Sequence, residues 1–443
     1  VFYAVRSIYV GEEISLTMPF DITKCARPNI LQLEPYRCAR DDYKDNGTNV
    51  LLDANENAYG PGLTLCDTVN STNGNGSGVH IDLSGLNRYP DPHQHELKHL
   101  LVKLRNTHVH TNKDLTPENL FVGVGSDEVI DALLRAFCIP GRDKILTCPP
   151  TYGMYAVSAQ VNDVRVVKVP LDVDDGFHAR PDAINDELSR DENIKLVYLC
   201  SPGNPTANLV RKEDVRAVLN HPTWNGIVVL DEAYIDFSPD GSSLAEWVAE
   251  WPNLVVMQTL SKSFGLAGIR LGAAFTSPEI AKLLNNLKAP YSISSPTSEV
   301  ARQALQPHNL AVMHHHRQQI LQQRERMLTE LPRIHGVGRT LGGRDSNFLL
   351  VEMLDAPGGR PSNEVALRVY EQLAQNRGVV VRFRGKEVGC LGCLRITVGR
   401  EEEVSRFLAE LEGVLGEVHS RGTSTVSNRQ QQEKEQDASE IVA

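Results

Sequence analysis

The sequence predicts an α/β fold in which a large domain, built on a mostly parallel sheet covered by helices, precedes a smaller α+β domain. Apolar, β-branched segments alternate with helical segments between residues 117 and 275, which is typical of β-α-β units. The chain has 443 residues, enough for several domain-sized units. Its 41% hydrophobic and 23% charged residues are typical of globular proteins and exclude a largely disordered or fibrous one.

The large domain is predicted from strands and helices that follow one another along the chain. Six segments rich in Val, Ile and Leu have the length of buried strands: Asn119–Val124, Lys144–Cys148, Val164–Val169, Lys195–Cys200, Gly226–Asp231 and Leu254–Thr259. Helical patterns fall between them at Glu128–Phe137, Arg180–Leu188 and Lys212–Leu219. We therefore expect parallel strands with helices on both faces of the sheet.

The smaller domain is predicted from the elements that follow a long helical region, Asn309–Leu331. Strands are expected at Phe348–Glu352, Val379–Phe383 and Leu394–Thr397, with helices at Asn363–Gln375 and Glu402–Leu415. We expect residues near the N-terminus to complete this domain.

The chain is expected to divide into five parts. We expect residues 1–18 to be a non-native or disordered extension, with the natural start at Met18, and residues 19–85 to form an N-terminal arm and part of the small domain. The large domain covers 86–325, the small domain 326–420, and a disordered tail rich in Gln, Glu and Ser covers 421–443. Within the arm, the Gly-, Asn- and Ser-rich segment Asn70–Gly78 is predicted to be a flexible loop.

Charge and composition exclude several classes of partner. With 45 Lys and Arg against 56 Asp and Glu, the net charge is −11, which repels nucleic acid and anionic lipid. We find no apolar run of about 18 residues and no secretion signal, so no membrane association is expected. The eight cysteines are scattered, as in reduced cytoplasmic proteins. Cys390 and Cys393 have the spacing of half a zinc site without a second pair, so we predict no metal.

Residues that follow the predicted strands carry the candidate chemistry, because ligands of such sheets lie at the carboxyl ends of the strands. Four of these strand ends are followed by a distinctive motif: Gly125-Ser126-Asp127-Glu128, Ser201-Pro202-Gly203-Asn204-Pro205-Thr206, Asp231-Glu232-Ala233-Tyr234, and Ser261-Lys262-Ser263-Phe264 with Gly268-Ile269-Arg270. Desolvation and a nearby arginine would make the amine of Lys262 nucleophilic toward an aldehyde. Asp231 would meet a cation such as a pyridinium. A phosphate dianion could be held by Ser126, Asp127, Ser261 and Arg270.

Taken in order, these motifs resemble those of the fold-type I pyridoxal-phosphate aminotransferases. Within that group the sequence is similar to the histidinol-phosphate aminotransferase family over roughly residues 20–418. The additional segments that carry this similarity are Leu52-Asp53-Ala54-Asn55-Glu56-Asn57, Leu86-Asn87-Arg88-Tyr89-Pro90, Cys148-Pro149-Pro150-Thr151-Tyr152-Gly153-Met154-Tyr155 and Gly392-Cys393-Leu394-Arg395-Ile396-Thr397-Val398-Gly399.

The resemblance implies pyridoxal 5′-phosphate as cofactor and a role for each matching residue. Lys262 would bind the cofactor covalently and transfer the substrate proton, and Asp231 would pair with the ring nitrogen. Tyr234 and Asn204 would bind the ring oxygen, and Tyr152 would stack on the ring. The resemblance also implies phosphate binding by Ser126, Asp127, Ser261 and Arg270, with Tyr89 supplied by the second subunit of a homodimer. For substrate, it implies Arg395 as the anchor of carboxylate and phosphate, with Tyr36, Asn55, Asn347 and Arg382 as weaker candidates.

The implied reaction transfers the amino group between L-histidinol phosphate and 2-oxoglutarate, a step of histidine biosynthesis. Gly203 and Ala207 depart from the usual family motif, so we expect the local loop geometry to differ from that of the family. An aromatic amino-acid aminotransferase, or another enzyme of the same fold such as a decarboxylase of phosphate-bearing amino acids, remains an alternative because the cofactor residues are shared. A non-catalytic protein on this fold is disfavoured, since a scaffold needs none of Lys262, Asp231, Tyr234 and Arg270.

Overall fold

The computed structural model describes residues 27–32, 47–64 and 85–440, with side chains among these up to residue 420. Two compact units are present, residues 1–35 and residues 36–443. The first unit contains one short described helix, α2 (Pro28–Leu31). The predicted extension before Met18, the loop Asn70–Gly78 and the candidate Tyr36 lie outside the described residues.

The second unit is organised around a seven-stranded sheet with the strand order β2-β8-β7-β6-β5-β3-β4. In this order, the consecutive strands β7, β6, β5, β3 and β4 pair in parallel with one another. Strand β8 is antiparallel to both of its neighbours, β2 and β7. The predicted mostly parallel sheet is therefore confirmed. Its strands are β2 (Leu120–Val124), β3 (Lys144–Thr147), β4 (Arg165–Lys168), β5 (Ile194–Cys200), β6 (Ile227–Asp231), β7 (Leu254–Thr259) and β8 (Leu271–Thr276).

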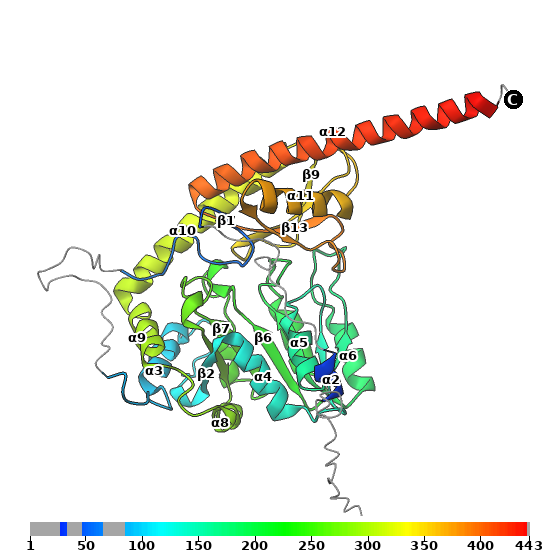
Figure 1. The fold of residues 1–443 in the computed structure, drawn as a ribbon. Coiled ribbons are helices and arrows are strands. Elements are labelled where there is room, and N and C mark those ends of the chain that lie inside the picture. The colour runs from blue at the N-terminus through cyan, green and yellow to red at the C-terminus, as the bar shows by residue number, and fades with distance from the viewer. Residues whose placement is uncertain (1–26, 33–46, 65–84, 441–443) are drawn as a thin grey trace, which may run out of the picture. The chain divides into compact units, whose positions relative to one another are not determined.

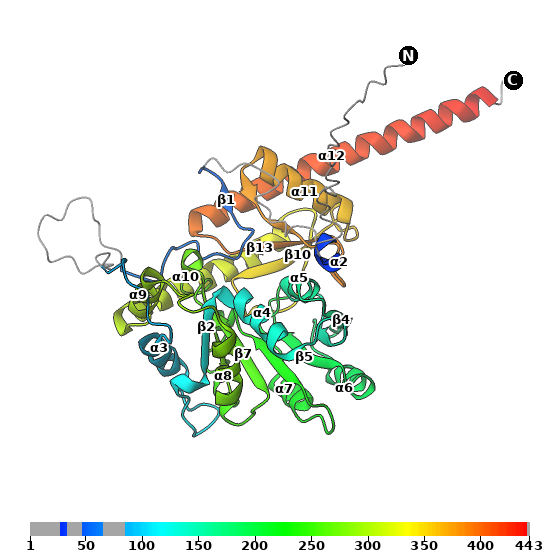
Figure 2. The ribbon, with the colours of Figure 1, turned by 60° about the horizontal axis from the view of Figure 1, so that its bottom comes forward.

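Helices cover both faces of this sheet because successive side chains of its strands point to opposite faces. On β5, Leu196 and Tyr198 join the core beneath α4, α5 and α8, while Val197 and Leu199 join the core beneath α3, α6 and α7. Figures 1 and 2 show α4 and α8 on the same side of the sheet, where both contact β2 and β8. These helices are α3 (His95–Arg105), α4 (Gly125–Phe137), α5 (Met154–Val161), α6 (Pro181–Arg190), α7 (Lys212–Leu219) and α8 (Pro278–Leu287). Short 3₁₀ turns link them at η2 (Pro117–Asn119), η3 (Ile235–Phe237), η4 (Ala245–Ala249) and η5 (Ala267–Ile269).

Strand β8 was not predicted, because its sequence LGAAFT contains a glycine and two alanines, which have little strand propensity. The structure shows why a small residue stands there. A Cβ at Gly272 would lie 2.4 Å from the backbone of Gly125 and Ser126, where α4 begins. Gly272 therefore lets the first residues of α4 approach the sheet.

The C-terminal part forms a four-stranded sheet of order β12-β13-β10-β9, with its own apolar core. Its strands are β9 (Val337–Leu341), β10 (Phe348–Met353), β12 (Arg382–Phe383) and β13 (Cys393–Thr397). The remaining helices are α9 (Ser295–Ala304), α10 (Pro307–Glu330), the 3₁₀ turn η6 (Leu331–Arg333), α11 (Asn363–Asn376) and α12 (Glu401–Glu440). Among them α10 crosses residue 325, the predicted boundary between the domains.

One prediction about this part is corrected. The single strand predicted at Val379–Phe383 is two: β11 (Val379–Val380) pairs in parallel with β1 (Val50–Leu51), whereas β12 pairs with β13. The N-terminal segment thus reaches this part of the fold. The backbone of α12 continues as helix to Glu440, through part of the segment 421–443 for which a disordered tail is predicted. Gln, Glu, Lys and Arg have high helix propensity, so a segment too polar to form a core can still be helical.

Candidate active site

A pocket lies where the sheet predicts it, at the carboxyl ends of β5, β6 and β7 and beside the first turn of α4. It encloses about 730 Å³, part of it open to solvent. Nine of the predicted residues line it together: Ser126, Asp127, Tyr152, Asn204, Asp231, Tyr234, Ser261, Lys262 and Arg270. The remaining lining residues are Ala54, Glu56, Cys200, Ala233, Thr259 and Ala267.

Lys262 supplies the amine of this pocket. Its Nζ donates a hydrogen bond of 2.8 Å to the backbone carbonyl of Ala54, a residue 208 positions earlier, and lies 5.7 Å from the ring centre of Tyr234. Burial, followed by the positive charges of Arg395 and Arg270, lowers the pKa of Lys262 to about 8. A larger fraction of this amine is therefore neutral and nucleophilic near neutral pH than of an ordinary lysine.

Asp231 supplies a buried carboxylate at the end of β6. Its Oδ2 accepts a 2.6 Å hydrogen bond from the Tyr155 hydroxyl, and its Oδ1 accepts one of 3.1 Å from the backbone N–H of Ala233. Burial raises the pKa of Asp231 to about 6, although both hydrogen bonds act in the opposite direction. A carboxylate held this way is suited to pair with a cation that enters the pocket.

Tyr234 is held between two amides. The Nδ2 atoms of Asn55 and Asn204 lie 3.0 and 3.4 Å from its hydroxyl oxygen. Burial raises the pKa of Tyr234 to about 12, so the hydroxyl stays protonated and can donate to an oxygen of a bound ring. The adjacent Tyr152 donates through its own hydroxyl to Asp127 Oδ1 over 3.1 Å and packs edge-on against Tyr155.

The opposite end of the pocket is suited to an anion. Ser126 and Asp127 are in the first turn of α4, where free backbone N–H groups and the helix dipole favour negative charge. Arg270 Nη2 lies 3.5 Å from Asp127 Oδ2, and Ser261 Oγ accepts a 2.9 Å hydrogen bond from Thr259 Oγ1. Gly125 has φ +76°, and a Cβ there would lie 2.6 Å from the Arg270 guanidinium. Position 125 therefore requires glycine, both because its φ is positive and because a side chain there would clash with Arg270.

Arg395 lies beside the pocket and belongs to the smaller sheet. Its Nη1 donates to Asn204 Oδ1 over 2.8 Å, and its Nη2 donates to the Asp53 carbonyl. Its Nε is buried and makes no hydrogen bond with protein. Burial, followed by the positive charge of Arg384, lowers the pKa of Arg395 to about 9. The buried donor indicates capacity for a further acceptor.

These features fit a phosphorylated pyridoxal aldehyde. The amine of Lys262, the carboxylate of Asp231 and the start of α4 are all present in one pocket, and they match the aldehyde, ring nitrogen and phosphate of such a molecule in charge and hydrogen-bonding capacity. Glycines at 125 and 272 let the start of α4 lie close to Arg270 and to β8, and Ser126 and Asp127 of this turn line the pocket.

Comparison with known proteins agrees with the geometry. Residues 48–411 match the family "Aminotransferase class I and II". A relative from Schizosaccharomyces pombe named histidinol-phosphate aminotransferase is 53% identical over 403 residues, which cover 91% of this chain and all of the relative. The Saccharomyces cerevisiae protein of the same name is 48% identical, over 90% of this chain and 98% of its own length.

The chain belongs to the histidinol-phosphate aminotransferase family. A crystal structure titled as histidinol-phosphate aminotransferase from Sinorhizobium meliloti in complex with pyridoxal-5′-phosphate superimposes with a TM-score of 0.72, covering 88% of this chain and 97% of that one. At 22% identity it shows a common fold, and a Thermus thermophilus aspartate aminotransferase shares that fold with a TM-score of 0.67. The predicted fold-type I architecture is confirmed.

Besides Arg395, four predicted residues in the described part of the chain lie outside the pocket lining of this histidinol-phosphate aminotransferase family member. Asn55 and Asn347 are buried behind it, with Asn347 Nδ2 donating to the Asn55 carbonyl over 3.2 Å. Arg382 lies across the strand pair from Arg395. Tyr89 is 81% exposed and stacks on Tyr291 with ring centres 4.5 Å apart.

Sequence reasoning missed three contributors to the site. Tyr155 was quoted as part of a motif but given no role. It is the second residue of α5, and its backbone N–H donates to the carbonyl of Tyr152, which precedes the helix. Glu56 and Cys200 also line the pocket. Glu56 follows the predicted residue Asn55, and Cys200 is the last residue of the predicted strand Lys195–Cys200. Burial raises the pKa of the Cys200 thiol, which keeps it protonated.

None of the helices in the described part of the chain has the length and apolar character that crossing a bilayer requires. Among the same residues, no group of three or more His, Cys, Asp or Glu side chains could hold a metal ion.

Proposed function

We propose that this chain binds pyridoxal 5′-phosphate and transfers the amino group between L-histidinol phosphate and 2-oxoglutarate, giving imidazole-acetol phosphate and glutamate in histidine biosynthesis. The observation that carries the proposal is the convergence of Lys262, Asp231, Tyr234 and Arg270 on one pocket. The chain is also 48% and 53% identical to two relatives named histidinol-phosphate aminotransferase.

When bound, pyridoxal phosphate supplies an aldehyde that carries the amino group and a ring that withdraws electrons from the substrate carbon. The Asp231 carboxylate would hold a proton at the ring nitrogen, and the hydroxyl of Tyr234 and the amide of Asn204 would bind the ring oxygen. Tyr152 would stack on the ring. The N–H groups at Ser126 and Asp127, with Ser261 and Arg270, would bind the phosphate.

Lys262 would move the proton at the substrate carbon. Its lowered pKa suits this task, because a general base with a pKa near the working pH is the most effective. Arg395 would bind the anionic end of each substrate in turn, since a planar guanidinium fits both carboxylate and phosphate. Asn55, Asn347, Arg382 and Tyr36 are further candidates for substrate contact.

A half-reaction tests the assignment. Cofactor-loaded protein is mixed with L-histidinol phosphate without keto acid, and the absorbance of the bound cofactor is followed, with histidine, tyrosine and phenylalanine as competing donors. Conversion to the amine form that is fastest with histidinol phosphate is expected. A faster response to an aromatic amino acid would instead favour an aromatic aminotransferase. Failure to gain a cofactor band on addition of pyridoxal phosphate would contradict both.

We also propose a homodimer in which Tyr89 completes the active site of the partner subunit. The proposal is supported by the high exposure of Tyr89, its stacking on Tyr291 and its absence from the pocket lining of its own chain. Sedimentation should give a dimer, and mixing inactive Lys262→Ala chains with Tyr89→Ala chains should restore activity through hybrid dimers. An active monomer would refute this arrangement.

A cytoplasmic location is proposed from the scattered cysteines. Cys138, Cys148, Cys200, Cys390 and Cys393 are free thiols in the structure, as a reducing compartment maintains them. Fractionation of cells that express the tagged chain would test it.

A further inference from the structure

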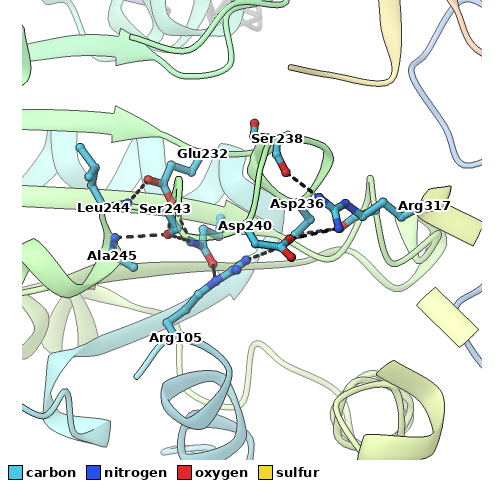
Figure 3. Close-up of polar contacts among 11 residues, drawn as sticks. Arg105, Glu232, Asp236, Ser238, Asp240, Ser243, Leu244, Ala245 and Arg317 are labelled. Atoms are coloured by element: carbon cyan, nitrogen blue, oxygen red, sulfur yellow. Dashed lines mark hydrogen bonds and ion pairs between the residues drawn. The ribbon is translucent and has the colours of Figure 1, made fainter. Parts of the chain in front are cut away.

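A polar network lies next to the pocket, outside its lining, and we call it the Arg105 network. Its members are Arg105, Glu232, Asp236, Ser243, Gln258 and Ser263. Arg105, the last residue of α3, donates through Nε to Gln258 Oε1 and through Nη2 to Asp236 Oδ1, both over 2.8 Å. Figure 3 shows Arg105 reaching toward Asp236, with Glu232, Ser243 and Leu244 grouped beside it.

One arm of the network ends next to Lys262. Asp236 Oδ2 accepts a 2.6 Å hydrogen bond from the hydroxyl of Ser263, the residue after Lys262. The carbonyl of Ser263 also accepts a 2.9 Å hydrogen bond from Asn57 Nδ2. Ser263 is 1% exposed, so both bonds are shielded from water. The backbone that carries the Lys262 side chain is therefore held from two sides.

The other arm ends next to Asp231. Gln258 Nε2 donates over 2.8 Å to Glu232 Oε2, and Glu232 is the residue after Asp231. The same carboxylate accepts hydrogen bonds of 2.6 Å from the Ser243 hydroxyl and from the Leu244 backbone N–H. Glu232 is 1% exposed, so its position is set by these donors.

Arg105 is the only member that bonds to both arms among the described contacts. Its side chain is 13% exposed, as is that of Asp236, which makes this an ion pair sheltered from water. The planar fork of a guanidinium fixes the directions of its two donors. Burial raises the pKa of Asp236, but Arg105 and the Ser263 hydrogen bond outweigh it, so the pKa is lowered and the carboxylate stays charged.

We infer that Arg105 is a positioning residue, which holds the backbone at Lys262 and at Asp231 in fixed relation through Asp236–Ser263 and Gln258–Glu232. The inference rests on the proposed function. Proton transfer by Lys262 requires its amine and the cofactor ring, which Asp231 would orient, to meet at a set distance. Errors of about 1 Å in such arrangements can lower rates about a hundredfold.

The test compares two substitutions within the network. Arg105→Lys keeps the positive charge but replaces the planar fork with a single ammonium that cannot reproduce both donor directions. Ser263→Ala removes only the hydroxyl at the Lys262 end and leaves the Arg105–Asp236 pair in place. The matched control is Arg317→Lys, because Arg317 forms an ion pair with Asp240 at 3.2 Å and donates to the Ser238 carbonyl over 2.6 Å in the same region.

Steady-state kcat and KM are measured on the cofactor-loaded protein together with three further quantities: the melting temperature, the pH titration of the cofactor absorbance without substrate, and the isotope effect for substrate deuterated at the amino-bearing carbon. In Arg105→Lys and Ser263→Ala we expect kcat to fall about tenfold or more with KM changed less than about threefold. The isotope effect should rise, since proton transfer becomes slower, and the midpoint of the absorbance titration should shift. Arg317→Lys should change only the melting temperature.

A merely structural role for Arg105 would give a lower melting temperature with an unchanged isotope effect and titration midpoint, and that result would overturn the inference. If Arg105→Lys does not fold, the same two readouts in Ser263→Ala decide. The absorbance titration needs no substrate, so an error in the proposed substrate would leave this test valid. Loss of the cofactor band from the unaltered protein would instead count against the proposed function itself.

Discussion

Arg395 and Asn204 are joined by a buried 2.8 Å hydrogen bond between the guanidinium of one and the side-chain oxygen of the other. Arg395 is on β13 of the smaller sheet, and Asn204 follows β5 of the larger one. The same Asn204 amide also approaches the Tyr234 hydroxyl. The proposed substrate anchor and the proposed ring-oxygen ligands are thus linked directly, so substitution of one should affect the other.

Arg395→Ala should raise KM for both L-histidinol phosphate and 2-oxoglutarate about tenfold to a hundredfold, because a charged hydrogen-bond donor contributes about 1.5–3 kcal/mol. Cofactor binding should be retained, although loss of the partner of Asn204 will weaken it modestly. Arg382→Ala, across the strand pair, should have a smaller effect on both constants. Steady-state kinetics with each substrate varied would measure this, and unchanged Michaelis constants would remove Arg395 from the site.

Lys262→Ala should abolish both turnover and the absorbance of covalently bound cofactor while the protein remains folded. The matched control is Lys98→Ala. Burial also lowers the pKa of Lys98 to about 8, but its Nζ bonds to Asn285 rather than facing the pocket. The control should keep both properties. Normal turnover by the Lys262 variant would show that another group performs the chemistry.

Cofactor capture by unloaded protein should become faster as pH rises through about 8. Only the neutral amine attacks an aldehyde, and the pKa of Lys262 is lowered to about 8 from the usual 10.5. The neutral fraction therefore increases over this range rather than near pH 10. Stopped-flow absorbance across pH 6 to pH 10 would give the midpoint, and a midpoint near that of an ordinary lysine would contradict the burial effect.

In Tyr155→Phe, the loss of cofactor affinity on acidification should occur at a higher pH than in the unaltered protein. The pKa of Asp231 is about 6, raised by burial, and the hydrogen bond from Tyr155 lowers it, so removing the hydroxyl raises it further. The carboxylate must be charged to pair with a protonated ring nitrogen, so affinity is lost as pH falls through this pKa. Phenylalanine keeps the stacking on Tyr198, at 4.6 Å between ring centres. Dissociation constants measured between pH 5 and pH 8 would reveal the shift, and superimposable curves would argue against it.

Gly272→Ala should weaken cofactor binding and cost about 1–3 kcal/mol of stability, as overpacking does. The new Cβ would lie 2.4 Å from the backbone of Gly125 and Ser126 and would displace the first turn of α4. Gly268→Ala is the control, because no atom lies within 4 Å of its added Cβ. Equal cofactor affinities for the two variants would mean that the close approach has no part in phosphate binding.

Much of the large sheet and its site could be predicted from sequence, for a physical reason. The parallel strands are continuous runs of apolar residues, and the polar residues that follow each run collect at one edge of the sheet. Asp231 and Lys262 could be found from this pattern, and the resemblance supplied their roles.

Other features have no local signal. The hydrogen bond from Lys262 to the Ala54 carbonyl joins residues 208 positions apart. Its acceptor is a backbone group, which every residue type has, so the sequence does not indicate it. Arg105 ends an ordinary amphipathic helix, and its importance depends on Asp236 and Gln258, which tertiary folding brings to it. Strand β8 has a glycine because its backbone lies close to the backbone of Gly125 and Ser126, and this contact cannot be inferred from the strand propensity of its own residues.

The segment around residues 53–57 has a consequence for how the protein is made. Its Ala54 carbonyl contacts Lys262, its Asp53 carbonyl contacts Arg395, and its Asn55 backbone N–H bonds to Thr397 Oγ1. A ribosome has released only part of the chain when Lys262 emerges, and β13 is still unsynthesised. The early segment must then wait for partners up to 342 residues later. Cofactor loading should therefore follow the completion of translation, and nascent chains that stop before Cys393 should emerge without a finished pocket.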